Sequence, residues 1–196
     1  MDSSAPFETP SHDYSHRMSL LDTLSKIEEM HLSGVINQYA IGGAIAAGFY
    51  LEPVQTEDVD IFVLFDSDPT DLNILAPIYN YAQGKGWKSE GLYIIVGEWP
   101  VQFLPHDSPL TKEAIENACE KTIGDFRTKV FTPEHLMAIA LKLGRPKDKI
   151  RLAQFHEESK ATDSPPLFDQ EKFEEILKTH KLEEKWKKFK TTVLES

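Results

Sequence analysis

The chain has 196 residues, of which 40% are apolar and 10% aromatic, and it carries a formal net charge of −11 at pH 7. The apolar content suffices for a hydrophobic core and excludes a globally disordered chain, while the length fits one domain with a helical extension. The negative charge excludes a broad nucleic-acid-binding surface, because neutralising phosphates takes clustered Lys and Arg, but it leaves room for RNA at one local basic patch.

The first predicted segment is a flexible leader over residues 1–17, which is polar and rich in Pro and Ser. It lacks the apolar stretch of a secretory signal peptide, and no apolar run in the chain is long enough to span a bilayer. The single cysteine, Cys119, cannot form an internal disulfide, which favours a reducing compartment. We therefore predict a cytoplasmic protein without a membrane partner.

Strand and helix patterns alternate after the leader. Apolar residues recur at helical spacing over 19–30, which predicts the first helix. The next predicted elements, in chain order, are a buried strand at 35–41, a short helix at 44–51, the strongest strand candidate at 59–65, a polar loop at 66–70 and a helix at 71–83.

The second half of the chain is predicted to become progressively helical. Strands at 92–96 and 101–104, a helix at 111–118 and a short strand near 129–131 come first. Thr132, Pro133 and Glu134 have the pattern of a helix start, and that helix is predicted to end at Gly144. A helix at 147–157 completes a main domain at 18–158, followed by a linker at 159–168 and C-terminal amphipathic helices at 169–196, broken near His180.

Gly42 and Gly43 separate the strand at 35–41 from the helix at 44–51. Glycines at this place let the backbone approach a ligand, and free N–H groups at a helix start favour a phosphate. An ordinary tight strand-to-helix turn is the alternative interpretation, because short glycine motifs have little specificity.

Asp58 and Asp60 lie at the start of the strongest strand candidate. Residues two apart in a strand face the same side, so the two carboxylates point together. Their repulsion is relieved by a divalent cation, and Mg²⁺ bound through one or two carboxylates and substrate phosphates is usual in phosphoryl chemistry. The alternative is a solvent-exposed strand entry with two solvated acids.

The two motifs in this order resemble the nucleotidyltransferase superfamily, the DNA polymerase β-like group. The resemblance implies an α/β fold, also described as α+β, with a mixed-sheet core and a C-terminal helical extension. It implies that Gly42 and Gly43 hold the triphosphate, while Asp58 and Asp60 bind the catalytic metal, Mg²⁺ or Mn²⁺. Thr56 matches the small hydroxyl residue that commonly precedes the acid pair, and it is predicted to contact the nucleotide.

The segment at 132–148, TPEHLMAIALKLGRPKD, resembles the C-terminal segment of abortive-infection type nucleotidyltransferase toxins and their stand-alone bacterial relatives. In that group a Lys on the helix and an Arg-x-Lys-Asp segment face the nucleotide. The matching positions are Lys142, Arg145, Lys147 and Asp148. The resemblance covers roughly residues 35 to 150.

Two positions depart from the pattern of this family. Gln102 stands where the family has a third carboxylate on a later strand, and a neutral amide is a weaker metal ligand. Glu98 and Asp107 lie nearby in the sequence but fit the strand phase less well. Arg151 stands three residues after Asp148, where relatives often carry another Asp.

The resemblance implies Mg²⁺-dependent transfer of a nucleotidyl group from a nucleoside triphosphate to an RNA, protein or small-molecule acceptor. The partners implied are the nucleoside triphosphate, a tRNA or protein acceptor, and an antitoxin partner. Because of Gln102, the alternative is a weak or inactive domain that binds a nucleotide or partner without turnover. A structural interaction module that uses the C-terminal amphipathic helices is a third interpretation, and it needs no metal.

Overall fold

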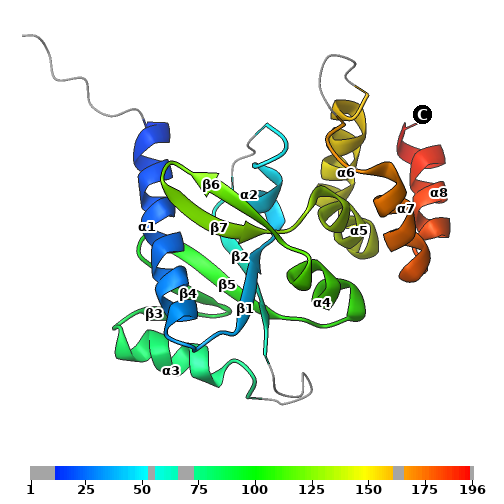
Figure 1. The fold of residues 1–196 in the computed structure, drawn as a ribbon. Coiled ribbons are helices and arrows are strands. Elements are labelled where there is room, and N and C mark those ends of the chain that lie inside the picture. Colours follow the sequence, from blue (N-terminus) through cyan, green and yellow to red (C-terminus); the bar gives the residue numbers. More distant parts are fainter. Residues whose placement is uncertain (1–11, 53–55, 66–72, 161–165, 195–196) are drawn as a thin grey trace, which may run out of the picture.

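The computed structural model describes residues 12–52, 56–65, 73–160 and 166–194 (Figure 1). Its strands form one mixed sheet in the order β3-β4-β5-β2-β1-β7-β6. The strands are β1 (Gln38–Ile41), β2 (Val59–Leu64), β3 (Lys88–Glu90), β4 (Tyr93–Val96), β5 (Trp99–Pro105), β6 (Cys119–Ile123) and β7 (Phe126–Val130). β2 lies near the centre, antiparallel to β1 and parallel to β5, and β1 is parallel to β7.

Helices lie on both sides of this sheet (Figure 1). They are α1 (His12–Leu32), α2 (Gly43–Ala47), α3 (Ala76–Gly84), α4 (Pro109–Glu116), α5 (Pro133–Leu143), α6 (Pro146–Glu158), α7 (Gln170–Thr179) and α8 (Glu183–Phe189), which continues into a π-helical turn, η1 (Lys190–Leu194). The predicted fold class, an α/β mixed sheet followed by helices, is confirmed. No helix in the described ranges combines the length and apolarity that crossing a membrane requires.

The alternation of side chains in β2 and β5 assigns one face of the sheet to the core. Val59 pairs with Val101, and both are fully buried. Trp99, two residues before Val101, shares its face and donates from Nε1 to Ser19 Oγ in α1. This face is therefore covered by α1, and the opposite face carries the alternate residues, which include Asp60.

The C-terminal helices are attached to the core by polar contacts as well as apolar packing. Glu113 of α4 accepts from Nε2 of His180, which follows α7, at 2.7 Å and lies 3.4 Å from Nε2 of the buried His135 in α5. Glu134 at the start of α5 accepts from the backbone N–H of Asp169 at 2.8 Å. Three helices are thus joined through two carboxylates.

Helix ends follow the predicted signals closely. Thr132 caps α5 and accepts from the backbone N–H of His135, while Gly144 ends the helix in the left-handed conformation. The predicted break near His180 is present, because α7 ends at Thr179 and α8 begins at Glu183.

Other boundaries differ from prediction. α1 already begins at His12, inside the predicted leader, whose residues 1–11 lie outside the described part. The stretch predicted to hold one short strand near 129–131 is a β6–β7 hairpin, and the edge strand β3 was not predicted. The predicted loop at 66–70 and residues 161–165 of the predicted linker lie outside the described residues.

Candidate functional site

The turn between β1 and α2 consists of two glycines that lie against β2. Gly42 donates its backbone N–H to the Asp60 carbonyl oxygen at 2.9 Å. A Cβ on Gly42 would overlap the Phe62 ring, while a Cβ on Gly43 would overlap Asp60 Oδ2 and lie 2.9 Å from Asp60 Cγ. Gly43 also has φ of +59°, a conformation that glycine adopts without steric cost. The glycines therefore allow α2 to pack on β2 and leave the Asp60 carboxylate against the turn.

Asp58 and Asp60 lie two residues apart at the start of β2. Burial raises the pKa of the Asp60 carboxyl, and the negative charge of Asp58 raises it further. The half-buried Asp58 accepts from Thr56 Oγ1 at 3.1 Å and from the Tyr93 hydroxyl at 3.4 Å. The pair is thus one oriented carboxylate beside one desolvated carboxylate, an arrangement that a cation would stabilise.

Gln102 lies directly beside Asp60. The parallel register of β2 and β5 pairs the two residues, and the buried Val59, Ile61 and Val101 take the other face. Gln102 and Asp60 therefore share one face of the sheet. Within the described residues, no group of three or more His, Cys, Asp or Glu side chains is placed to hold a metal ion.

The donors at this place fit one hard cation. Asp58 and Asp60 offer carboxylate oxygens, and Gln102 offers a neutral amide oxygen on the same face. Mg²⁺ is commonly held by one or two carboxylates, with substrate phosphates and water completing the octahedron. A second cation would need further negative charge, which the amide does not supply. The residues therefore fit a single Mg²⁺ or Mn²⁺.

Three cations in the first half of α6 and at its N-cap interact electrostatically with Asp60, and their charges lower its pKa: Lys147, Arg145 and Arg151. Arg145 donates from Nε and Nη2 to the buried Asp148 at 2.7 and 3.1 Å. Asp148 also accepts from the Arg145 backbone N–H, so it caps α6. Two predicted nucleotide-binding residues, Arg145 and Lys147, thus lie in the electrostatic surroundings of Asp60.

Lys142, the third basic residue predicted to bind the nucleotide, lies beside Asp107. Its Nζ lies 3.9 Å from Asp107 Oδ1. Asp107 lies two residues after Pro105, the last residue of β5. His106, between them, donates its backbone N–H to the Val63 carbonyl oxygen near the end of β2. Lys142 Nζ therefore lies near the end of β2, whereas Asp60 lies at its start.

A hollow of about 610 Å³ lies next to Asp58 on the sheet. It is lined by Thr56, Glu57, Asp58, Glu90, Tyr93, Ile95 and Pro100. The sequence analysis did not select Tyr93, because its contact with Asp58 depends on the pairing of β4 with β5. In the sequence, the residues that line this hollow alternate with buried ones: Tyr93 and Ile95 flank the buried Ile94. This alternation is the signal that could have identified Tyr93.

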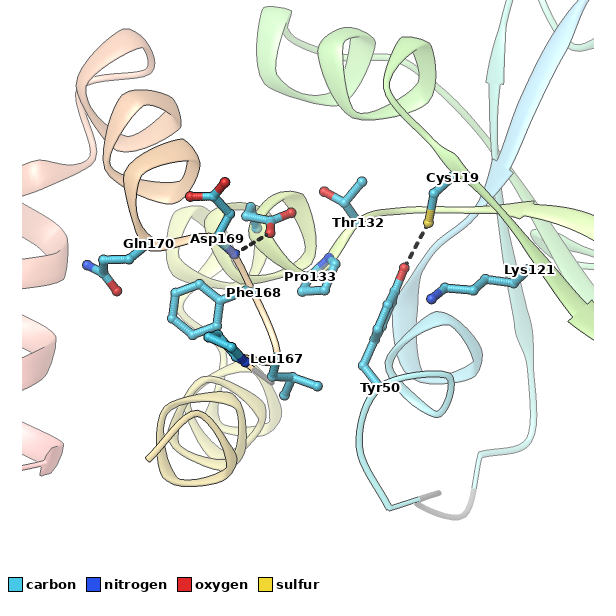
Figure 2. Close-up of a pocket in the computed structure, with 11 residues that line it drawn as sticks. Tyr50, Cys119, Lys121, Thr132, Pro133, Leu167, Phe168, Asp169 and Gln170 are labelled. Carbon is cyan, nitrogen blue, oxygen red and sulfur yellow. Dashed lines mark hydrogen bonds between the residues drawn. The ribbon is translucent and has the colours of Figure 1, made fainter. Parts of the chain in front are cut away.

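A second hollow, of about 670 Å³, lies where the C-terminal segment meets the core (Figure 2). The Tyr50 hydroxyl lies 3.0 Å from Cys119 Sγ and donates to the Phe131 carbonyl oxygen at 3.0 Å. Lys121 Nζ lies 4.4 Å from the centre of the Tyr50 ring. Neither aspartate of the acidic pair lines this hollow.

Comparison with solved structures identifies similar folds. An antigenic nucleotidyltransferase-like protein from Paracoccidioides brasiliensis is 16% identical, with a TM-score of 0.50, over 85% of this chain and 88% of that chain. The antibiotic-resistance factor ANT(2'')-Ia is 13% identical, with a TM-score of 0.46, over 89% and 93% of the two chains. No protein-family model and no curated protein matches the chain. The first likeness shows that the chain has a nucleotidyltransferase-like fold.

Proposed function

We propose that this protein is a Mg²⁺-dependent nucleotidyltransferase, with Asp58 and Asp60 as the metal-binding residues. The observation that carries the proposal is the contact of the desolvated Asp60 carboxylate with the Gly42–Gly43 turn, beside Asp58. A phosphate that approaches the glycine backbone would also approach both carboxylates. The nucleotidyltransferase-like fold supports the proposal.

In the proposed reaction, an acceptor hydroxyl oxygen forms a bond to the α-phosphorus of a nucleoside triphosphate. The bond between the α-phosphorus and the bridging oxygen breaks, pyrophosphate leaves with the electron pair of that bond, and the hydroxyl proton passes to solvent water. Mg²⁺ bound to the pair would polarise phosphate oxygens and neutralise charge. The chain's own contribution is positioning: Thr56 and Tyr93 orient Asp58, and Gly43 holds Asp60.

The hollow beside Asp58 is the proposed place for the acceptor. It opens next to the carboxylate that Thr56 and Tyr93 orient. Its wall combines the acids Glu57 and Glu90 with apolar surface. An RNA end, a protein hydroxyl and a small molecule stay the proposed classes of acceptor, and an antitoxin stays a proposed partner.

The first experiment measures thermal unfolding with nucleoside triphosphates. We expect the triphosphate to raise the melting temperature only with Mg²⁺ or Mn²⁺, because a ligand specific for the folded state stabilises it by about 2.7 kcal/mol at a hundredfold excess over Kd. Replacing both acids, Asp58→Asn with Asp60→Asn, should remove the shift, whereas Asp125→Asn in the exposed β6–β7 turn should keep it. An equal shift in the double variant would refute the metal site.

A second candidate function is nucleotide binding without turnover, which the pairing of Gln102 with Asp60 favours. The change Gln102→Asp should strengthen Mn²⁺ binding, measured by calorimetry with a non-hydrolysable triphosphate, because a carboxylate adds a full charge where the amide adds a dipole. Gln83→Asp, on the exposed surface of α3, adds the same charge elsewhere and should change nothing. Unchanged binding in Gln102→Asp would mean that Gln102 is not at a metal position. Turnover of labelled triphosphate by the wild type separates the two functions.

A further inference from the structure

Arg151 is placed on the inner side of α6. The buried residues of this helix are Asp148, Leu152 and Phe155, and Arg151 borders that stripe because it lies three residues after Asp148 and four before Phe155. The Arg151 side chain is half-buried, whereas Lys147, one turn earlier, is exposed. Arg151 is therefore held at the edge of the protein interior and is not a freely solvated surface cation.

α6 approaches α2 at two points that lie on either side of Arg151 along the helix. The Phe155 ring lies 6.5 Å from the ring of Tyr50, which follows α2. At its other end, the first turn of α6 interacts electrostatically with Asp60, which touches Gly43 at the start of α2. Arg151 thus lies on α6 between the contact with Tyr50 and the first turn, and it interacts electrostatically with Asp60 itself.

The Arg151 guanidinium makes no hydrogen bond or ion pair with a protein acceptor in the ranges that the structure describes. The nearest candidate on its own helix, Asp148, is occupied by Arg145, which donates to both carboxylate oxygens. Burial lowers the pKa of Arg151, while the charges of Asp148 and Asp60 raise it. A half-buried guanidinium with its fork of donors unused is suited to a planar or tetrahedral oxyanion.

The charges around Asp60 favour a polyphosphate as that oxyanion. Arg145 is neutralised locally by Asp148, and Lys147 is exposed to solvent. A single Mg²⁺ would balance Asp58 and Asp60 but would leave most of the charge of a triphosphate unbalanced. Because the Gln102 amide beside Asp60 does not support a second metal ion, the remaining phosphate charge needs a cation from the protein. Arg151 supplies that positive charge. We propose that Arg151 binds the polyphosphate tail of the nucleotide directly, and that it does so without a metal ion. This inference rests on the proposed function.

The test uses inorganic tripolyphosphate as the probe, titrated calorimetrically into the full chain with EDTA present. The wild type should bind, and Arg151→Gln should weaken binding about tenfold or more, because a hydrogen-bonded charge pair typically contributes one to two powers of ten in affinity. Arg151→Lys should fall between them, since it keeps the charge and loses the bidentate fork. Lys149→Gln removes an exposed charge from the same helix and should bind like the wild type.

A second variant separates this inference from the proposed function. Asp60→Asn removes a negative charge that interacts with Arg151, so it should strengthen tripolyphosphate binding in EDTA while weakening the Mg²⁺-dependent binding of nucleoside triphosphate. Circular dichroism verifies that each variant is folded. The inference is overturned if the wild type does not bind tripolyphosphate in EDTA, if Arg151→Gln binds as the wild type does, or if Lys149→Gln loses as much affinity as Arg151→Gln. Mg²⁺-dependent nucleotide binding would survive each of these outcomes.

Discussion

Asp60 and Asp148 both have carboxylates with limited solvent access, but the two differ in the hydrogen bonds that the protein donates to them. Asp148 is 1% exposed, and Arg145 donates three hydrogen bonds to it. Among the described residues, no donor bonds to the Asp60 carboxylate, and its closest charged neighbour in the sequence, Asp58, repels it. A carboxylate satisfied by its own protein stabilises the fold, whereas one left unsatisfied is available to a ligand.

The largest expected effect on the free energy of unfolding comes from removing the carboxylate charge at each of these two positions. Asp148→Asn should lower the free energy of unfolding by about 2 kcal/mol, because it weakens the cap of α6 and a charge-assisted pair. Asp60→Asn is the matched control: the same change should raise stability modestly, since it removes a desolvated charge beside Asp58. Urea denaturation at neutral pH measures both. A loss of stability in Asp60→Asn equal to that in Asp148→Asn would contradict the contrast.

A smaller effect is expected from the pH dependence of His135, the buried imidazole beside Glu113. Burial lowers the pKa of His135, although Glu113 and Glu134 oppose this and Lys172 adds to it. Below the ordinary histidine pKa of about 6.5, His135 therefore binds a proton in the unfolded chain more readily than in the folded chain. The free energy of unfolding should decrease as the pH is lowered, by up to about 1.4 kcal/mol per pH unit.

Urea denaturation at pH 7.5, 6.5 and 5.5 measures this slope. His135→Gln should flatten it, whatever the variant's absolute stability. His156→Gln is the control, because His156 is more exposed and should contribute less. A slope unchanged by His135→Gln would show that the buried imidazole does not titrate as expected.

The sequence predicted the features whose cause is local. The glycine turn, the acidic pair and the Thr132–Gly144 helix are each specified by neighbouring residues. The β6–β7 hairpin was missed because two of its inward-facing positions carry the polar residues Lys121 and Thr128, which obscure the apolar alternation. β3 was missed because its three residues are all exposed and polar, and it forms only by pairing with β4.

Contacts between distant segments were beyond the sequence analysis. The bond between His180 and Glu113 joins residues 67 positions apart, and no local pattern indicates it. Arg151 departs from the family pattern in the sequence, but the sequence alone does not indicate that its side chain is half-buried. The contact between Lys142 and Asp107 likewise joins two segments that no local pattern relates.

The overlap between an added Cβ at Gly43 and the Asp60 carboxylate also has an evolutionary consequence. A side chain at position 43 would overlap this carboxylate and would also have to adopt the φ of +59°, so a lineage that keeps the acid is expected to keep the glycine. Loss of the acid removes only the first of these two constraints. A side chain at position 43 in a related sequence would therefore indicate that the carboxylate at 60 has been lost.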